Sequence, residues 1–270
     1  MKIIRLSSVI FLLALISFLS CSSENLSGKY ASFWRKARKI DLIPANVVDG
    51  DTFKIGKNSF RVVGIDAPEI HNGNKPIGEF GEVSKRFFED FTRKFKEGYI
   101  LKGKDRFGRS LAYLFAKDGT YIYFYEASVT ELGLARPLIY EEDSIKELID
   151  DVVKSYKKAW RNRRGIFSRW ENAPIVSYGD SWKDKIGKIV WLEDHIVKVF
   201  ETHALYIAKG DFSSVVARKE GYKLMFKNFD FYSLEGKNIR VYGELWEYDG
   251  HPEIMVRAPF EIVFFKGGKR

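Results

Sequence analysis

Residues 47–69 constrain the fold of this chain more than any other stretch, because they hold two strand-like runs joined by a short turn. Asp49 and Asp51 flank a glycine before the first run, and Asp66 and Glu69 close the second. The second run is rich in β-branched residues, which predicts a strand, and a proline ends it. If the two strands pair, the acids gather at one edge of a sheet. Carboxylate oxygens are the ligands that a hard divalent cation such as calcium takes.

Two arginines accompany these acids. Arg61 opens the second run, and Arg109 lies in a glycine-containing turn, residues 105–109, before another strand-like run. A bound cation takes one oxygen of a phosphodiester, while guanidinium groups take the others as negative charge develops. The combination of acids and arginines therefore favours a site that binds a phosphodiester.

These pieces resemble the staphylococcal nuclease (thermonuclease-like) family. One of them alone would be a weak signal, but together they keep the order and spacing of that family from Val47 to Phe167. The matching pieces are Asp49–Thr52, Arg61, Gly64–Glu69, Asp105–Arg109, Gly133–Ala135 and Gly165–Phe167.

The resemblance implies an α+β fold based on β-barrels. The first barrel is a five-stranded OB barrel with flanking helices. Residues 236–243, the Asp249-Gly250 turn and Pro252–Ile254 resemble the closing hairpin of nucleic-acid-binding OB-folds, so a second OB-fold-like barrel is expected. The expected domains are a signal peptide at 1–20, a tether at 21–40, the nuclease-like domain at 41–169, a linker at 170–183 and the second barrel at 184–270.

The resemblance also implies the calcium ligands. Asp51 and Asp66 would bind the ion through their side chains, and Ala67 through its main-chain carbonyl. The type member of the family has threonine at the position of Ala67, so here the carbonyl is kept and a hydroxyl is lost. Asp49 is expected to organise the turn rather than to contact the ion.

The remaining roles concern water and phosphate. By the resemblance, Glu69 would act on the attacking water, as general base or by positioning it. Arg61 and Arg109 would bind the non-bridging phosphate oxygens, more strongly as the phosphorus becomes five-coordinate. Phe107 replaces a tyrosine common in the family. Tyr140 lies one position away from the place where the family has an aromatic residue that stacks on the base.

Each of these residues alone has an ordinary structural explanation. Asp-Gly pairs are common in hairpin turns, and single aspartates and arginines are usually surface charges. Taken together, the five side chains have assignable roles in one reaction, which favours a catalytic site. They are Asp51, Arg61, Asp66, Glu69 and Arg109.

The charge of the chain agrees with an anionic partner. Its formal net charge is +9 over 270 residues, and +7 remains once Lys2 and Arg5 leave with the signal peptide. Nucleic acid or an anionic membrane surface would suit this charge, although solubility alone is the simpler explanation. A hydrophobic content of 45% excludes a disordered chain.

The N-terminus predicts export. Lys2 and Arg5 precede a short apolar run at 9–16, and small residues surround Cys21, the single cysteine of the chain. This arrangement resembles a bacterial lipoprotein signal, in which Cys21 is lipidated and anchors the protein to the cell-envelope membrane. A plain cleaved signal peptide, with secretion, and a retained anchor are the alternatives. Phe18 stands where such signals usually have leucine.

The sequence thus predicts a monomeric, exported, calcium-dependent nuclease that hydrolyses DNA, with RNA as a further candidate substrate, and has low sequence specificity. A catalytically inactive nucleic-acid-binding surface protein is the first alternative, and a module that binds protein or glycan is the second. In the second barrel, aromatic and basic residues would either grip nucleic acid or serve the barrel core and its fold. They are Trp246, Tyr248, Lys237, Arg240 and Arg257.

Overall fold

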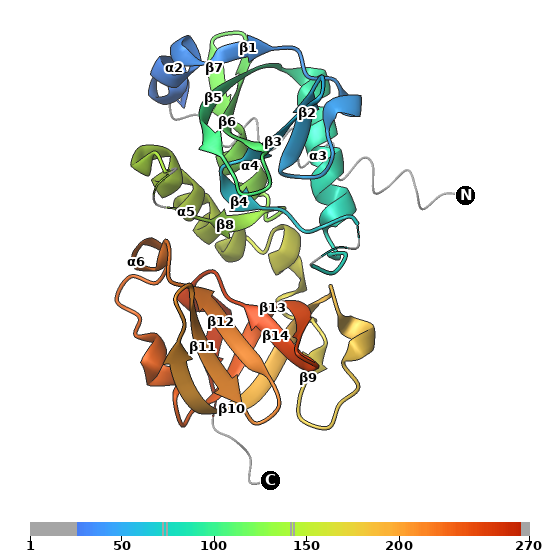
Figure 1. The fold of residues 1–270 in the computed structure, drawn as a ribbon, viewed down its shortest axis with the longest axis vertical. Helices are drawn as coiled ribbons and strands as arrows, with labels where there is room; N and C mark the ends of the chain where they lie inside the picture. Colours follow the sequence, from blue (N-terminus) through green and yellow to red (C-terminus); the bar gives the residue numbers. More distant parts are fainter. Residues whose placement is uncertain (1–25, 72, 74, 141, 143, 266–270) are drawn as a thin grey trace, which may run out of the picture.

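The computed structural model describes residues 26–71, 73, 75–140, 142 and 144–265. In this part of the chain two sheet-based units lie end to end, an N-terminal unit up to about residue 169 and a second unit from residue 175 (Figure 1). The predicted signal peptide and Cys21 lie outside the described residues. Across the described ranges, no helix combines the length and the apolar character needed to cross a membrane.

The N-terminal unit mixes strands and helices. Its main sheet has the order β1-β5-β6-β3-β2, with β7 paired to β6, and β4 and β8 form a separate pair. The strands are β1 (Arg38–Ile40), β2 (Thr52–Ile55), β3 (Asn58–Val62), β4 (Gly64–Asp66), β5 (Lys96–Lys104), β6 (Ser110–Asp118), β7 (Tyr121–Phe124) and β8 (Arg136–Leu138). The helices are α2 (Leu26–Lys36), α3 (Gly81–Lys94), α4 (Tyr125–Glu131) and α5 (Lys146–Arg161).

The hairpin predicted within residues 47–69 is present as β2 and β3. Thr52 lies opposite Arg61 in its antiparallel register. β3 then pairs in parallel with β6, so that Arg61 lies beside Leu111. This register brings the residue before β2, the end of β3 and the start of β6 to the same region of the sheet.

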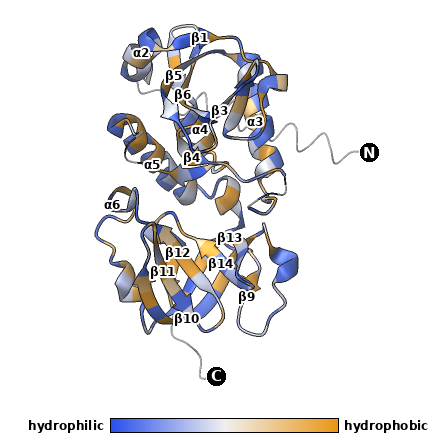
Figure 2. Cartoon of the chain, in the orientation of Figure 1, coloured by the Kyte–Doolittle hydropathy of each residue, from blue (hydrophilic) through white to orange (hydrophobic). Residues whose placement is uncertain are grey.

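Apolar faces of the helices close the core of this unit. Leu148, Ile149 and Val152 of α5 are fully buried, as the 3.6-residue periodicity of the sequence predicts. Phe88 of α3 is also fully buried and stacks on Tyr125, with ring centroids 4.3 Å apart. Figure 2 shows hydrophobic residues along α5 and along the strands of the second unit.

The tether predicted at 21–40 is wrong for residues 26–40, which belong to the folded unit. β1 pairs with β5, with Arg38 opposite Tyr99. In α2, Tyr30 is buried and its hydroxyl donates a hydrogen bond to Asp151 of α5 at 2.7 Å. The basic residues of this segment favour a solvated linker, and this explains the wrong prediction.

The second unit contains β9 (Ile175–Val176), β10 (Ile189–Glu201), β11 (Leu205–Gly210), β12 (Ser214–Arg218), the short α6 (Tyr222–Met225), β13 (Asn238–Tyr248), β14 (His251–Met255) and β15 (Ile262–Phe264). Strand pairing runs from β10 through β11, β12, β14 and β13, and β13 pairs with β10 again. The pair β12–β14 is parallel. Within the predicted linker, Ile175 pairs with Trp191, so this short stretch belongs to the sheet.

Aromatic residues join the two units into one packed structure. Tyr156 and Phe167 of the first unit share a buried cluster with Trp191 and Tyr242 of the second. The indole N–H of Trp191 donates to the carbonyl of Trp170 at 2.9 Å. The second unit therefore packs directly on the first and is not a separate domain on a free linker.

We expect the stability of the protein to fall between about pH 4.5 and pH 8 because of Glu97. Burial raises the pKa of this carboxyl, on β5, from 4.5 to about 8, against the opposing effect of a hydrogen bond from the amide of Leu42. The folded state thus keeps a proton that the unfolded chain loses, and the free energy of unfolding decreases with rising pH across this window. Glu97→Gln should gain about 2 kcal/mol over the wild type between pH 5 and pH 8 in urea unfolding. Parallel pH profiles would contradict this, and the exposed Glu82→Gln is the control.

Docking of α2 can be tested at Tyr30. Tyr30→Phe removes the hydroxyl that donates to the buried carboxylate of Asp151, at an expected cost of about 1–3 kcal/mol in the free energy of unfolding. Tyr121→Phe, at a side chain that is 55% exposed, should change stability by less than about 0.5 kcal/mol. Equal stabilities of the two variants would show that this hydrogen bond does not stabilise the docking of α2.

Candidate active site

Asp51 lies just before β2 and is 5% exposed. One of its carboxylate oxygens accepts a hydrogen bond from the amide of Ala67 at 2.6 Å, and the other accepts one from the hydroxyl of Thr52 at 3.0 Å. Arg61 forms an ion pair with the same carboxylate. The structure therefore places Asp51 against the loop that follows β4.

Arg61 connects the two predicted acidic ligands. It donates to Asp66 Oδ1 at 3.0 Å and to the carbonyl of Ile65 at 3.0 Å, in addition to its ion pair with Asp51. The guanidinium side chain is 11% exposed. A planar donor fixed on three sides keeps its orientation, so Arg61 is positioned before any ligand arrives.

Asp66 is the most strongly neutralised acid of the site. Its side chain is 2% exposed and forms ion pairs with Arg61, with Lys75 at 2.6 Å and with Arg257 at 2.8 Å. Burial alone would raise the pKa of Asp66, but the charges of Lys75, Arg257, Arg61 and Arg136 hold it far below its ordinary value. This carboxylate is therefore ionised throughout the physiological pH range.

Glu69 lies at the rim of the same site, and its side chain is 36% exposed. Lys75 approaches it to 3.4 Å while also contacting Asp66, so one ammonium group bridges the two carboxylates. The main chain of Glu69 is fixed by a hydrogen bond from the amide of Gly78 to its carbonyl, at 2.9 Å. A carboxylate in this position is open to water and adjacent to the buried acids.

Arg109 follows the turn that precedes β6. Its Nε donates to Asp105 at 2.7 Å, and its guanidinium lies 5.6 Å from the ring centroid of Phe107. Two backbone amides, of Phe107 and Arg109, also donate to Asp105, which organises the turn. Arg109 is one-third exposed and can therefore reach a ligand at the surface.

Asp49 has the structural role that the sequence predicts. Its carboxylate accepts the amide of Asp51 at 3.0 Å and thereby shapes the turn before β2. Burial raises the pKa of Asp49, and the charges of Arg61 and Arg109 act in the opposite direction. Both arginines thus lie within electrostatic range of one carboxylate, which connects Arg109 to the rest of the site.

The oxygen atoms of this site suit calcium in kind. Asp51 and Asp66 offer buried carboxylates, and Ala67, whose carbonyl is the third predicted ligand, is hydrogen-bonded to Asp51. No group of three or more His, Cys, Asp or Glu side chains within the described ranges is placed to hold a metal ion. Calcium at this position would therefore depend on two acids, a carbonyl and water, and it would compete with Lys75 for Asp66.

Residues predicted to grip nucleic acid in the second unit differ widely in their exposure. Arg257 is buried against Asp66, so it is not part of an exposed grip. Arg240 is paired with Glu193 in its own sheet. Tyr248 is 70% exposed at the end of β13, and Trp246 is half-buried on the same strand.

Sequence reasoning missed Lys75 and assigned Arg257 to the second barrel alone, not to this site. Lys75 lies in a loop whose glycine, asparagine and proline residues predict irregular structure without indicating a direction for the side chain. Arg257 follows a strand almost 200 positions after Asp66, and no local pattern reports a contact across that distance. The available signal was an arginine within an otherwise apolar stretch, Ile254–Ala258, where a charged residue is unusual.

Comparison with known proteins agrees with the geometry. The family model described as "Staphylococcal nuclease homologue" matches residues 59–169. Thermonuclease of Staphylococcus intermedius is 27% identical over 145 residues, covering 51% of this chain and 84% of the relative, and that of Staphylococcus hyicus is 27% identical over 164 residues, covering 58% and 95%.

A third relative has a longer match. It is an uncharacterized protein of Methanocaldococcus jannaschii, 27% identical over 204 residues, which make up 63% of this chain and 96% of the relative. Arg61, Asp66, Glu69 and Arg109 lie inside the matched family segment, and Asp51 lies just before it. Residues 59–169 of this chain are therefore similar to the staphylococcal nuclease family, and the two thermonucleases support the same family.

Proposed function

We propose that this protein is a calcium-dependent nuclease that hydrolyses phosphodiester bonds in DNA, and in RNA as a further candidate, with little sequence preference. The observation that carries the proposal is the convergence of Asp51, Arg61 and Asp66 into one buried network, with Glu69 and Arg109 more exposed beside it. Contacts to phosphate provide affinity without reading bases, which accounts for low sequence specificity. We further propose that the protein acts as a monomer.

Different residues of the chain bind the phosphate, act on the attacking water and hold the metal ion. Arg61 and Arg109 bind the non-bridging oxygens of the scissile phosphate and stabilise the charge that develops on them. Glu69, open to solvent at the rim, orients the attacking water or removes its proton. Asp51, Asp66 and the carbonyl of Ala67 would hold calcium, which when bound polarises the phosphate.

The second unit is proposed to be an OB-like barrel. Its support is the order of strand pairing, which leaves β10 and returns to it, together with the parallel pair β12–β14. The OB-fold is a five-stranded, partly open barrel. In this chain, residues 219–237 connect β12 to β13 and contain α6.

One observation favours a second candidate, an inactive protein that only binds nucleic acid. Every carboxylate oxygen of Asp66 contacts a basic side chain, and Lys75 lies between Asp66 and Glu69. A network that is fully neutralised without a metal ion has less need of one. Metal-dependent cleavage separates the two candidates.

The decisive measurement is cleavage of single- and double-stranded DNA, and of RNA, by residues 22–270 with calcium or with a chelator. We expect cleavage with calcium only. Glu69→Gln and Arg109→Ala should each lower its rate by about 10²-fold or more, because each removes a group that acts on the transition state.

Matched controls lie close to both residues. Arg106→Ala removes a neighbouring exposed arginine of the same turn, and Glu82→Gln neutralises an exposed acid of α3. Both should cleave within about threefold of the wild type. A wild type that binds DNA in a salt-dependent manner but never cleaves it would establish the binding protein instead.

We also propose export and lipid anchoring through Cys21, on the pattern of residues 1–22 alone. In the full chain made in a bacterium, Cys21→Ser should abolish fatty-acid labelling and move the protein out of the membrane fraction. A wild type that is exported without label would indicate an ordinary signal peptide. A labelled serine variant would contradict Cys21 as the acceptor.

A further inference from the structure

The second unit reaches into the candidate active site through Arg257. This residue follows β14 and is 5% exposed, and its guanidinium donates to Asp66 Oδ2 at 2.8 Å. The other oxygen of Asp66 is bound by Arg61 and Lys75 of the first unit. The carboxylate is therefore held from opposite units, one oxygen by each.

Arg257 is itself held firmly in place. The carboxylate of Glu261 accepts the backbone amides of Arg257 and Ala258, the latter at 3.0 Å, and it also accepts the hydroxyl of Tyr156 from α5. The amide of Val256 donates to Val216 of β12 at 2.9 Å. The main chain on both sides of Arg257 is thus fixed to the second unit and to α5.

The interface between the two units around Asp66 and Arg257 is called the seam below. A second buried ion pair crosses this seam in the opposite direction. Arg136 of β8 pairs with Glu244 of β13, and both are less than 5% exposed. Arg136 lies directly opposite Asp66 in the β4–β8 register. Each unit thus contributes one buried arginine and one buried acid at the position of Asp66.

The loop that follows Glu69 is also fixed by the second unit. The amide of Glu79 donates to the carbonyl of Gly187 at 2.8 Å, and the Glu79 side chain accepts the amide of Ile189 at 3.1 Å. The approach is close enough that a Cβ on Gly78 would lie 2.8 Å from Glu244 Oε1. Because Gly78 binds the carbonyl of Glu69, the rim of the site depends on this contact as well.

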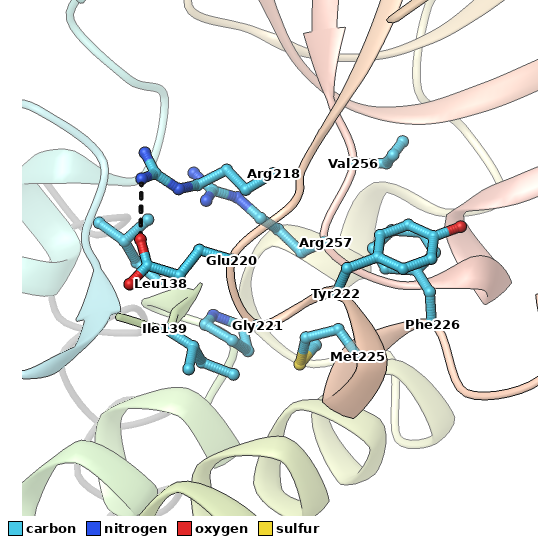
Figure 3. Close-up of a pocket in the computed structure, with 11 residues that line it drawn as sticks. Leu138, Ile139, Arg218, Glu220, Gly221, Tyr222, Met225, Phe226, Val256 and Arg257 are labelled. Carbon is cyan, nitrogen blue, oxygen red and sulfur yellow. Dashed lines mark ion pairs between the residues drawn. The ribbon is translucent and has the colours of Figure 1, made fainter. Parts of the chain in front are cut away.

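Figure 3 shows the seam around Arg257. Its side chain runs beside that of Arg218, which forms an ion pair with Glu220, while Leu138 and Ile139 of the first unit line the same pocket. Arg218 also lies 4.7 Å from the ring centroid of Tyr140. The guanidinium of Arg257 is therefore enclosed by side chains of both units.

We propose that Arg257 is a positioning residue for the nuclease reaction, so that the active site is completed by the second unit. Resting on the proposed nuclease function, this assigns to the second unit the orientation of the metal-binding acid Asp66 and of the Glu69 loop. Partners that orient a metal-binding carboxylate typically contribute 10–100-fold to metal affinity or activity. Arg257 has the burial, the geometry and the independent anchoring that such a partner needs.

The test compares Arg257→Gln with Arg257→Lys in the chain lacking only its leader. The glutamine variant should bind calcium about 10-fold more weakly in calorimetry and lower kcat by about 10–100-fold, with KM for DNA within about threefold. The lysine variant keeps the charge and should recover part of both losses. Arg240→Gln is the control, since it breaks a more exposed arginine–glutamate pair within the second unit that does not involve Asp66.

Thermal unfolding is measured in parallel, so that rates are compared at a temperature where all variants are folded. A merely structural Arg257 would lower the melting temperature but leave the calcium affinity and kcat of the folded variant unchanged, and this result would overturn the inference. Equal losses in Arg240→Gln would overturn it too. A wild type that neither binds calcium nor cleaves DNA would contradict the proposed function itself, and the inference with it.

Discussion

The structure depends on one buried, ionised carboxylate. Asp66 is almost completely enclosed, and an unpaired charge in that position would cost several kcal/mol. Three basic side chains from three different segments compensate for it, and the last of them, Arg257, comes from the second unit. The requirement to neutralise one acid thus determines where a loop, a strand and a whole second sheet must lie.

The glycines of the two late family motifs have a common physical reason. A Cβ on Gly133 would lie 2.3 Å from the carbonyl oxygen of Arg164, and one on Gly165 would lie 2.2 Å from that of Gly133. Both glycines have positive φ, and the amide of Ile166 donates to the carbonyl of Gly133 at 2.9 Å. The end of α4 and the end of α5 therefore touch through their backbones. This contact directs the chain after α5 towards the seam.

Local patterns in the sequence predicted what local interactions determine. The hairpin within residues 47–69 and the turn at Asp249 were both predicted, because strand patterns and turn chemistry act over a few residues. The acids and arginines of the site were predicted from a family motif with characteristic spacing. The docking of α2 through Tyr30 was not predicted. Basic residues flank the aromatic residues of this segment and favour a solvated structure.

Contacts between distant segments could not be predicted in this way. Arg257 belongs to a strand end, Lys75 to an irregular loop and Arg136 to a short strand, and each looks like a surface charge in isolation. Their ion-pair partners become evident only in the folded structure, where the two units are in contact. A residue's role in such a network depends on the partner it meets, and sequence periodicity carries no information about that partner.

Charge pairing at the seam also explains why the two units pack in a single relative arrangement. An apolar seam, such as the cluster around Tyr242, favours contact but tolerates sliding, because hydrophobic burial is non-directional. The pairs Arg257–Asp66 and Arg136–Glu244 do not tolerate it, since a shift would leave a buried charge unpaired at a cost of about 3–5 kcal/mol. Apolar packing thus supplies the affinity between the units, and the crossed ion pairs select the one arrangement that places Asp66 in the candidate active site.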